Sequence, residues 1–158
     1  MRYYLLDRVT ELTAGHSARG IKCVTLSDEI LHDHFPGFPM LPGALVVESA
    51  AQLAGFLLEL TFHKPGEPVL RAVLVQIQRA KFYEPIRPGD RLDLVATIES
   101  TREASAQVGF TAAVDGKDAA RGTLTFVLRA IDEPRVHEQR RQVYAIWTRD
   151  LSPPPVLP

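Results

Sequence analysis

The sequence predicts an α+β fold, in which an antiparallel sheet of about six strands wraps around one long, buried central helix. Ala44–Leu60 predicts the helix, because it is dominated by Ala and Leu, contains no proline, and is apolar around most of its circumference. Segments with alternating or β-branched residues lie before and after the helix and predict the strands. A sheet around the helix would bury the helix and one side of each strand.

Local signals separate these elements. Pro42 suits the first turn of the helix, and Lys64-Pro65-Gly66 ends it. Pro85 and Pro88-Gly89-Asp90 punctuate the first strands after the helix, and Asp115-Gly116 has the composition of a tight hairpin turn. The six expected strands are Leu5–Val9, Ile21–Leu26, Val69–Gln78, Arg91–Glu99, Ala104–Val114 and Ala119–Arg129.

The composition changes near the C-terminus. Residues 1–131 are expected to form the main domain, and residues 132–158 a C-terminal extension. Arg135–Arg149 places apolar residues among charges, which permits a short helix that packs on the barrel or on a neighbouring protomer. Ser152–Pro158 is rich in proline and is expected to be an extended, mobile tail.

A proline- and glycine-rich loop stands directly before the central helix. His34–Gly43 contains three prolines and two glycines, which fix backbone angles and allow tight bends, so the histidine at its head is held in place. In the helix, Glu48 and Gln52 are four residues apart and lie on one face, where the amide can hydrogen-bond the carboxyl group. Glu59 lies further along roughly the same side.

These residues carry a family resemblance. The string His34-Phe35-Pro36-Gly37-Phe38-Pro39-Met40-Leu41-Pro42-Gly43, followed by Glu48-Ser49-Ala50-Ala51-Gln52, resembles the signature of the 3-hydroxyacyl-[acyl-carrier-protein] dehydratases of the FabZ type, which have the hotdog fold. Tyr4–Val9 and Ala80–Asp90 resemble further segments of that family, so the likeness covers roughly residues 3–130. Ala44 and Ser49 depart from the commoner valine and alanine.

The resemblance implies a catalytic pair, His34 and Glu48, shared between the two protomers of a homodimer, with each active site taking one residue from each chain. Glu48 favours plain dehydration, because a related branch that also isomerises the double bond carries aspartate there. The substrate is a 3-hydroxyacyl chain on acyl carrier protein, and assembly beyond the dimer is left open. The sequence leaves acyl chain length open too.

The chemistry can be argued from the residue types. A neutral His34 suits removal of the proton beside the thioester carbonyl, and Glu48 suits protonation of the leaving hydroxide if burial keeps it protonated. The backbone N–H of Gly43, at the helix N-terminus, is the candidate donor to the carbonyl oxygen. Gln52 would orient Glu48. The reaction requires no cofactor and no metal.

Two further sets of residues are assigned by resemblance. Four aromatic residues could line the acyl tunnel, or could equally pack in the core or an interface: Phe35, Phe38, Phe82 and Tyr83. The carrier protein is acidic, so four basic residues beside the tunnel mouth are candidates for docking it, although scattered cations also form ordinary solvated surface: Arg79, Lys81, Arg87 and Arg91.

Other interpretations of the same residues stay open. His32-Asp33-His34 could ligate zinc, and His34 could simply brace its loop. Glu48 could lie on a solvated strip of the helix. The protein could instead be a hotdog thioesterase, in which Glu48 activates water, or a non-catalytic module that binds the carrier. Free acid product would reveal the first, and binding without conversion the second.

Composition limits the remaining classes. The 158 residues suit one domain, and a net charge of −1 with a pI near 6.5 gives no reason to expect nucleic-acid binding. Cys23, the single cysteine, excludes an internal disulfide and is expected to be a small packing residue in its strand. Met1–Arg8 has too short an apolar run for a secretory signal, and the central helix is expected to fall short of a membrane span. We therefore expect a cytoplasmic protein.

Overall fold

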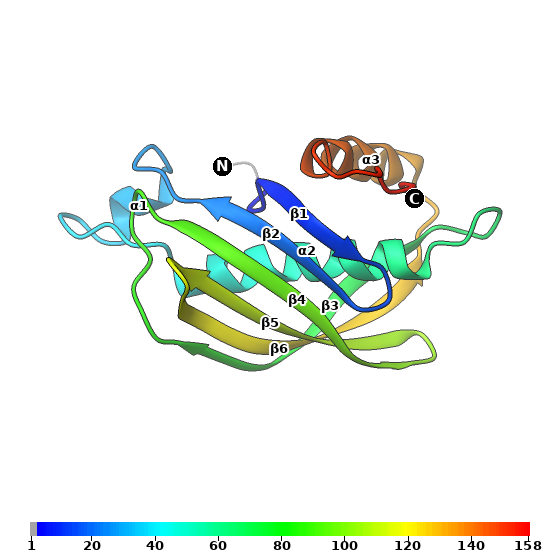
Figure 1. The fold of residues 1–158 in the computed structure, drawn as a ribbon, viewed down its shortest axis with the longest axis horizontal. Coiled ribbons are helices and arrows are strands. Elements are labelled where there is room, and N and C mark those ends of the chain that lie inside the picture. The colour runs from blue at the N-terminus through cyan, green and yellow to red at the C-terminus, as the bar shows by residue number, and fades with distance from the viewer. Residues whose placement is uncertain (1–2) are drawn as a thin grey trace.

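A computed structural model describes residues 3–158. Met1 and Arg2, which belong to the segment judged not to be a secretory signal, lie outside the described residues. Figure 1 shows a curved sheet that wraps around one long helix, as the sequence predicts. All pairings in the six-stranded sheet are antiparallel, and the strand order is β1-β2-β4-β5-β6-β3. The strands are β1 (Arg8–Thr13), β2 (Ser17–Cys23), β3 (Leu70–Phe82), β4 (Arg91–Arg102), β5 (Ser105–Val114) and β6 (Lys117–Ala130).

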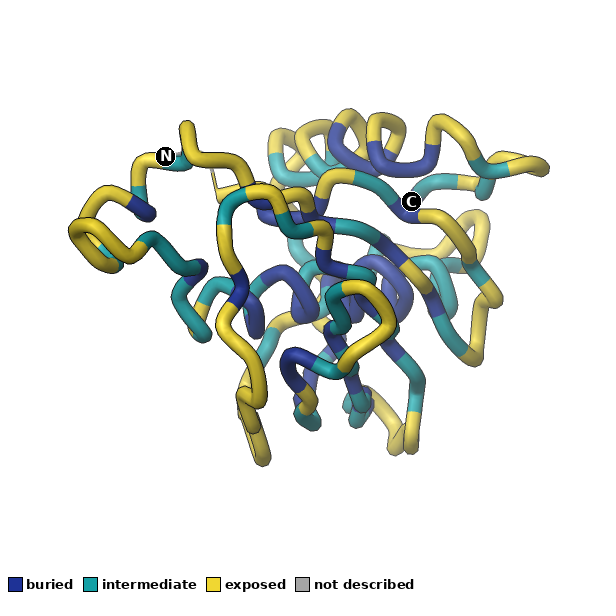
Figure 2. Tube along the Cα trace, turned by 60° about the vertical axis from the view of Figure 1, so that its left-hand side comes forward, coloured by how far each residue is buried: buried dark blue, intermediate teal, exposed yellow. Residues whose placement is uncertain are grey.

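The central helix α2 (Gly43–Phe62) provides the middle of the core. Its apolar side chains pack against the inner face of the sheet, and Figure 2 shows it enclosed by the surrounding strands. The helix is 20 residues long, longer than predicted, and its length and composition alone would allow it to cross a membrane. Since 67% of that apolar window is buried inside the protein, α2 is a core helix.

The first two strands are displaced from their predicted positions. Leu5 and Leu6 are buried but precede β1, because the backbone N–H of Leu5 donates to Gln52 Oε1 and not to another strand. The second strand ends at Cys23, and this residue is exposed, so the prediction that it is a small packing residue was wrong. The short helix α1 (Ile30–Asp33) was not predicted.

The hairpin turn between β5 and β6 confirms the sequence signal. Asp115 and Gly116 have φ angles of 50° and 78°, in the left-handed region that this type of tight turn requires. Asp and Gly tolerate that region better than other residues. The local sequence therefore fixes the connection that places β5 beside β6.

The C-terminal extension folds onto the barrel of its own chain. Helix α3 (Pro134–Trp147) begins with a proline in its first turn, and the Glu133 side chain accepts a hydrogen bond from Arg135 N. In Figure 1, α3 lies above β1. The tail after Ser152 is extended as predicted, but the expectation of mobility was wrong, because Leu157 packs against the core and Pro158 is buried.

Strand β3 forms one edge of the sheet. One side of it pairs with β6, and its other side has no strand partner among residues 3–158. This strand also exposes four large apolar residues: Val73, Val75, Ile77 and Phe82. An exposed, apolar edge of this kind is a site for pairing with another chain.

Candidate active site

The loop before α2 holds His34 through backbone and side-chain bonds. Phe35 and Phe38 exchange backbone hydrogen bonds of 3.0 and 2.9 Å, and Gly37 between them has a φ of 74°, so the tip is a tight turn. Met40 N donates to His34 O at 2.8 Å and closes the base of the loop. The loop therefore has one defined shape, as its prolines and glycines predict.

The hydrogen bond of the His34 ring fixes its tautomer. His34 Nδ1 lies 2.9 Å from Met40 O, and because a carbonyl oxygen can only accept, Nδ1 carries the proton. In the neutral ring, the lone pair is then on Nε2. The ring also stacks on Phe35, with centroids 4.1 Å apart. His34 thus braces the loop with one nitrogen and has the other available as a base.

Glu48 is oriented by Gln52, one helical turn further along α2. Gln52 Nε2 donates to Glu48 Oε1 at 3.0 Å, which is the contact that their spacing predicts. Glu48 is half-buried in the protomer and not fully buried. Burial and the neighbouring Glu48 carboxylate, with which its hydroxyl interacts, raise the pKa of Tyr3. Tyr3 is a residue of this site that the sequence analysis did not single out.

Gly43 is the first residue of α2, and there is no room for a side chain at this position. A Cβ atom at this position would lie 2.9 Å from ring carbons of Phe82, at the end of β3. The amide groups of the first helical turn have no partner within the helix and carry the positive end of its dipole. The absence of a side chain therefore lets Phe82 cover the helix N-terminus while the N–H of Gly43 can point at a ligand.

The four candidate tunnel aromatics all lie at the surface of the protomer. Phe35, Phe38, Phe82 and Tyr83 have exposed fractions of 48% to 52%. These four side chains do not pack in the core of the protomer, so the interpretation as core residues was wrong. Exposed aromatic side chains such as these four can form the wall of a tunnel or a contact between protomers.

His34 and Glu48 do not meet within one chain. Among residues 3–158, no hydrogen bond or ion pair joins the two side chains. His32, Asp33 and His34 do not form a metal site either, since the described part of the chain has no group of three or more His, Cys, Asp or Glu side chains that could hold a metal ion. Within the described residues, the two members of the predicted pair are therefore held by separate contacts, His34 by Met40 and Glu48 by Gln52.

A family model described as a FabA-like domain matches residues 1–123. The chain belongs to this family. It is also 40% identical over 134 residues to the 3-hydroxyacyl-[acyl-carrier-protein] dehydratase FabZ of Levilactobacillus brevis, and the alignment covers 84% of this chain and 88% of that protein. The FabA-like assignment thus includes the loop, α2 and most of the sheet.

Solved structures agree on the fold. The chain is similar to a hot-dog-like protein from Thermanaerovibrio acidaminovorans, with a TM-score of 0.63 and 18% identity, over 82% of this chain and 93% of that one. It is similar to a chain of the dehydratase heterocomplex ApeI:P from Xenorhabdus doucetiae, with a TM-score of 0.61 and 23% identity, over 80% and 99% of the two chains. The hotdog fold predicted from the FabZ-type resemblance is confirmed.

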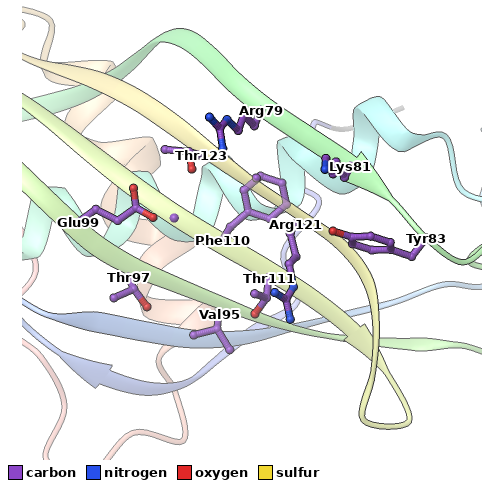
Figure 3. Close-up of a pocket in the computed structure, with 12 residues that line it drawn as sticks. Arg79, Lys81, Tyr83, Val95, Thr97, Glu99, Phe110, Thr111, Arg121 and Thr123 are labelled. Atoms are coloured by element: carbon purple, nitrogen blue, oxygen red, sulfur yellow. The ribbon is translucent and has the colours of Figure 1, made fainter.

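The candidate docking residues do not form one cluster in this FabA-like protein. Arg79 and Lys81 lie on the outer face of the sheet, where they border a hollow of about 420 Å³ together with Arg121 of β6 and Tyr83 (Figure 3). Lys81 lies directly opposite Arg121 in the strand register, and Arg121 pairs with Asp118 of its own strand. No local signal in the sequence points to Arg121, because only the pairing of β3 with β6 places it beside Lys81.

The other two candidates have separate surroundings. The Arg87 guanidinium lies 4.7 Å from the ring centroid of Phe38 and so packs on the histidine loop. Arg91 pairs with Asp93 at 3.1 Å, and this hydrogen bond raises the pKa of Arg91. Arg91 also lines a different hollow, on the outer face of β1, β2 and β4. Of the four candidates, only Arg79 and Lys81 therefore border the same hollow.

Proposed function

We propose that this FabA-like protein eliminates water from (3R)-3-hydroxyacyl-[acyl-carrier-protein] thioesters to give trans-2-enoyl thioesters. The observation that carries the proposal is the orientation of His34, whose Nδ1–H is committed to Met40 O and whose Nε2 is thereby the base. The FabZ relatives, at up to 40% identity over most of the chain, support the same reaction.

The steps follow from the side chains. His34 Nε2 takes a proton from C2 of the substrate, and the electron pair forms the C2–C3 double bond as the C3–O bond breaks. The Glu48 carboxyl group gives its proton to the departing hydroxyl, which leaves as water. Negative charge that develops on the thioester oxygen is received by the N–H of Gly43. His34 gains one proton and Glu48 loses one, so the total number of protons on the enzyme does not change in the reaction.

The active site belongs to a homodimer in this proposal. His34 of one protomer faces Glu48 of its partner, which is consistent with the absence of a hydrogen bond or ion pair between the two side chains among residues 3–158. The unpaired edge of β3, with Val75 and Ile77 exposed by 53% and 51%, supports pairing of the two sheets. Partner aromatic residues would then bury Glu48 and keep it protonated.

The carrier protein is proposed to dock near Arg79 and Lys81 and to thread its acyl chain past Phe82 and Tyr83. Both basic residues lie on β3. Phe82 is the last residue of this strand, and Tyr83 follows it directly. An acidic partner would be drawn to this cluster by charge. We place the reaction in the cytoplasm, where an exposed thiol such as that of Cys23 stays reduced.

Mass spectrometry of a short 3-hydroxyacyl carrier substrate tests the reaction. The parent is expected to remove one water while the acyl chain stays on the carrier, and His34→Ala and Glu48→Gln are each expected to lower the rate by about 10²- to 10⁴-fold. Glu48→Gln should leave the melting temperature unchanged, and His34→Ala should keep the chain folded but lower it modestly, because the loop loses the bond to Met40 O. Release of free acid would indicate a thioesterase. Saturable carrier binding with no conversion over several chain lengths would indicate a binding module.

Light scattering tests the dimer. The parent is expected to have the mass of two chains, and Ile77→Lys is expected to give a folded monomer with little activity, because a charge on the apolar edge opposes pairing. Leu26→Lys is the matched control, since Leu26 is 64% exposed and lies outside the sheet. A monomeric, active parent would contradict the shared site.

A further inference from the structure

We infer that helix α3 positions the catalytic carboxyl group of Glu48 through the N-terminal segment Tyr3–Leu5. The inference rests on the proposed function for the role of Glu48. It assigns a task to the C-terminal extension, which begins beyond residue 123, where the match to the FabA-like model ends. A continuous series of contacts leads from Glu48 through Gln52 and the N-terminal segment to α3.

The first contacts fix the Gln52 side-chain amide. Its Nε2 donates both to Glu48 Oε1 at 3.0 Å and to Tyr3 O at 3.1 Å, and its Oε1 accepts from Leu5 N at 2.9 Å. Both N–H groups and the carbonyl oxygen are therefore engaged. A flipped amide would turn its oxygen towards two acceptors, Glu48 and Tyr3 O. The N-terminal segment thus selects the amide orientation that donates to Glu48.

The N-terminal segment is in turn held by α3. Gln139 Nε2 donates to the Tyr4 hydroxyl at 2.5 Å. Tyr4 lies between Tyr3 and Leu5, whose backbone groups hydrogen-bond the Gln52 amide. The bond to Gln139 therefore restrains both of these residues. A hollow of about 550 Å³ lies between the segment and the helix, lined by Tyr3, Tyr4, Gln139, Gln142, Val143 and Ile146. Because this hollow separates the N-terminal segment from α3, the hydrogen bond between Gln139 and Tyr4 is a main contact between them.

Helix α3 is rigid enough to serve as a support. Tyr144 and Trp147 are buried and pack on Phe56 of α2, with ring centroids 5.0 and 6.4 Å from it. Near the start of α3, His137 Nδ1 accepts a hydrogen bond of 2.9 Å from Nη2 of the Arg71 guanidinium. The two aromatic contacts attach α3 to the same central helix that carries Glu48 and Gln52, so a closed path of contacts leads from Glu48 through the N-terminal segment and α3 back to α2.

Three variants test the positioning role. Gln139→Ala is expected to lower kcat about 3- to 10-fold with little change in KM, the range that one neutral hydrogen bond supplies. Gln139→Glu is expected to restore most of kcat, because the introduced carboxylate can accept from the Tyr4 hydroxyl. Gln142→Ala is the matched control, since Gln142 lies on the same helix and its amide donates to Glu138.

A second readout does not depend on turnover. Hydrogen exchange of the Gln52 side-chain amide, followed by NMR and assigned with Gln52→Glu, is expected to be slow in the parent and in Gln142→Ala. It is expected to be at least several-fold faster in Gln139→Ala, because the segment no longer fixes the amide. All variants should keep the parent's melting temperature within a few degrees, which separates positioning from general destabilisation.

The outcomes distinguish the two proposals. If the parent does not remove water, the dehydratase function fails, and exchange at Gln52 still decides whether α3 orients the amide. Unchanged exchange and unchanged kcat in Gln139→Ala would overturn the positioning role while leaving the dehydratase intact. Equal losses in Gln139→Ala and Gln142→Ala would also overturn it, since the effect would then belong to α3 in general.

Discussion

The Tyr144 hydroxyl of α3 donates a 2.7 Å hydrogen bond to Oε2 of Glu59, a buried carboxylate near the end of the central helix. The same oxygen accepts from Arg71 at 2.6 Å, and Glu59 Oε1 accepts from Ala72 N at 3.1 Å. A buried charge is tolerated only when it is paired and hydrogen-bonded, and these three donors meet that condition. The C-terminal helix is therefore tied to the core by a polar contact as well as by aromatic packing.

Tyr144→Phe should lower the free energy of unfolding by about 1.5–3 kcal/mol, because it removes a hydrogen bond to a charged group without changing the packing of the ring. Urea denaturation followed by circular dichroism measures this. Ile146→Ala, at an exposed position of the same helix, should change the stability by less than about 0.5 kcal/mol. Equal effects of the two substitutions would show that the hydrogen bond contributes little.

The stability contributed by Tyr144 should depend on pH in the alkaline range. Burial, followed by the charge of Glu59 and the hydrogen bond to it, raises the pKa of Tyr144 well above its usual range. A tyrosine in the unfolded chain titrates near about pH 10. The contribution is therefore fully present below about pH 10 and is lost as the pH rises through the folded pKa.

The difference in unfolding free energy between the parent and Tyr144→Phe measures this contribution directly. It should be constant between about pH 7 and 9 and should shrink above about pH 10. Other lysine and tyrosine groups titrate in the same range, but they are present in both proteins and cancel in the difference. A difference that grows with pH would contradict the assignment.

Gly43→Ala should lower kcat by about tenfold or more, because the added methyl group meets the Phe82 ring and disturbs the helix N-terminus that receives the thioester oxygen. Adding Phe82→Leu should recover part of the loss, since a smaller side chain leaves room for the methyl group. Steady-state kinetics of the two single variants and the double variant test this coupling. Strictly additive losses would show that Phe82 is not the obstacle.

Reversing the charges of Arg79 and Lys81 should raise KM for a carrier-bound substrate about tenfold and leave kcat nearly unchanged, because in the proposed docking these residues attract the acidic partner and take no part in the chemistry. A short pantetheine thioester, which lacks the carrier, should show no such change. Arg91→Glu is the matched control, because Arg91 lines another hollow and is paired with Asp93. A larger effect of Arg91→Glu would move the docking site to that surface.

The site residues show where local sequence is informative and where it is not. The His34 loop, the Glu48–Gln52 contact and the Asp115-Gly116 turn were predictable, because each depends on residues close together in the chain and on the dihedral preferences of Pro and Gly or on helical spacing. Arg121 was missed, because it is brought beside Lys81 by strand register. Tyr3 was missed because its contact with the Gln52 amide spans 49 positions.

The sequence by itself determined the buried central helix and the alternating strands, since hydrophobic periodicity is a property of consecutive residues. The pair His34 and Glu48 stays a prediction that the FabZ resemblance implies. The tertiary structure alone decided that Cys23 is exposed, that Glu59 is buried with Arg71 and Tyr144, and that α3 reaches the N-terminal segment. Those contacts join residues 12 to 135 positions apart. They depend on how the elements pack, and periodicity within one element carries no information about which distant side chain will satisfy a buried polar group.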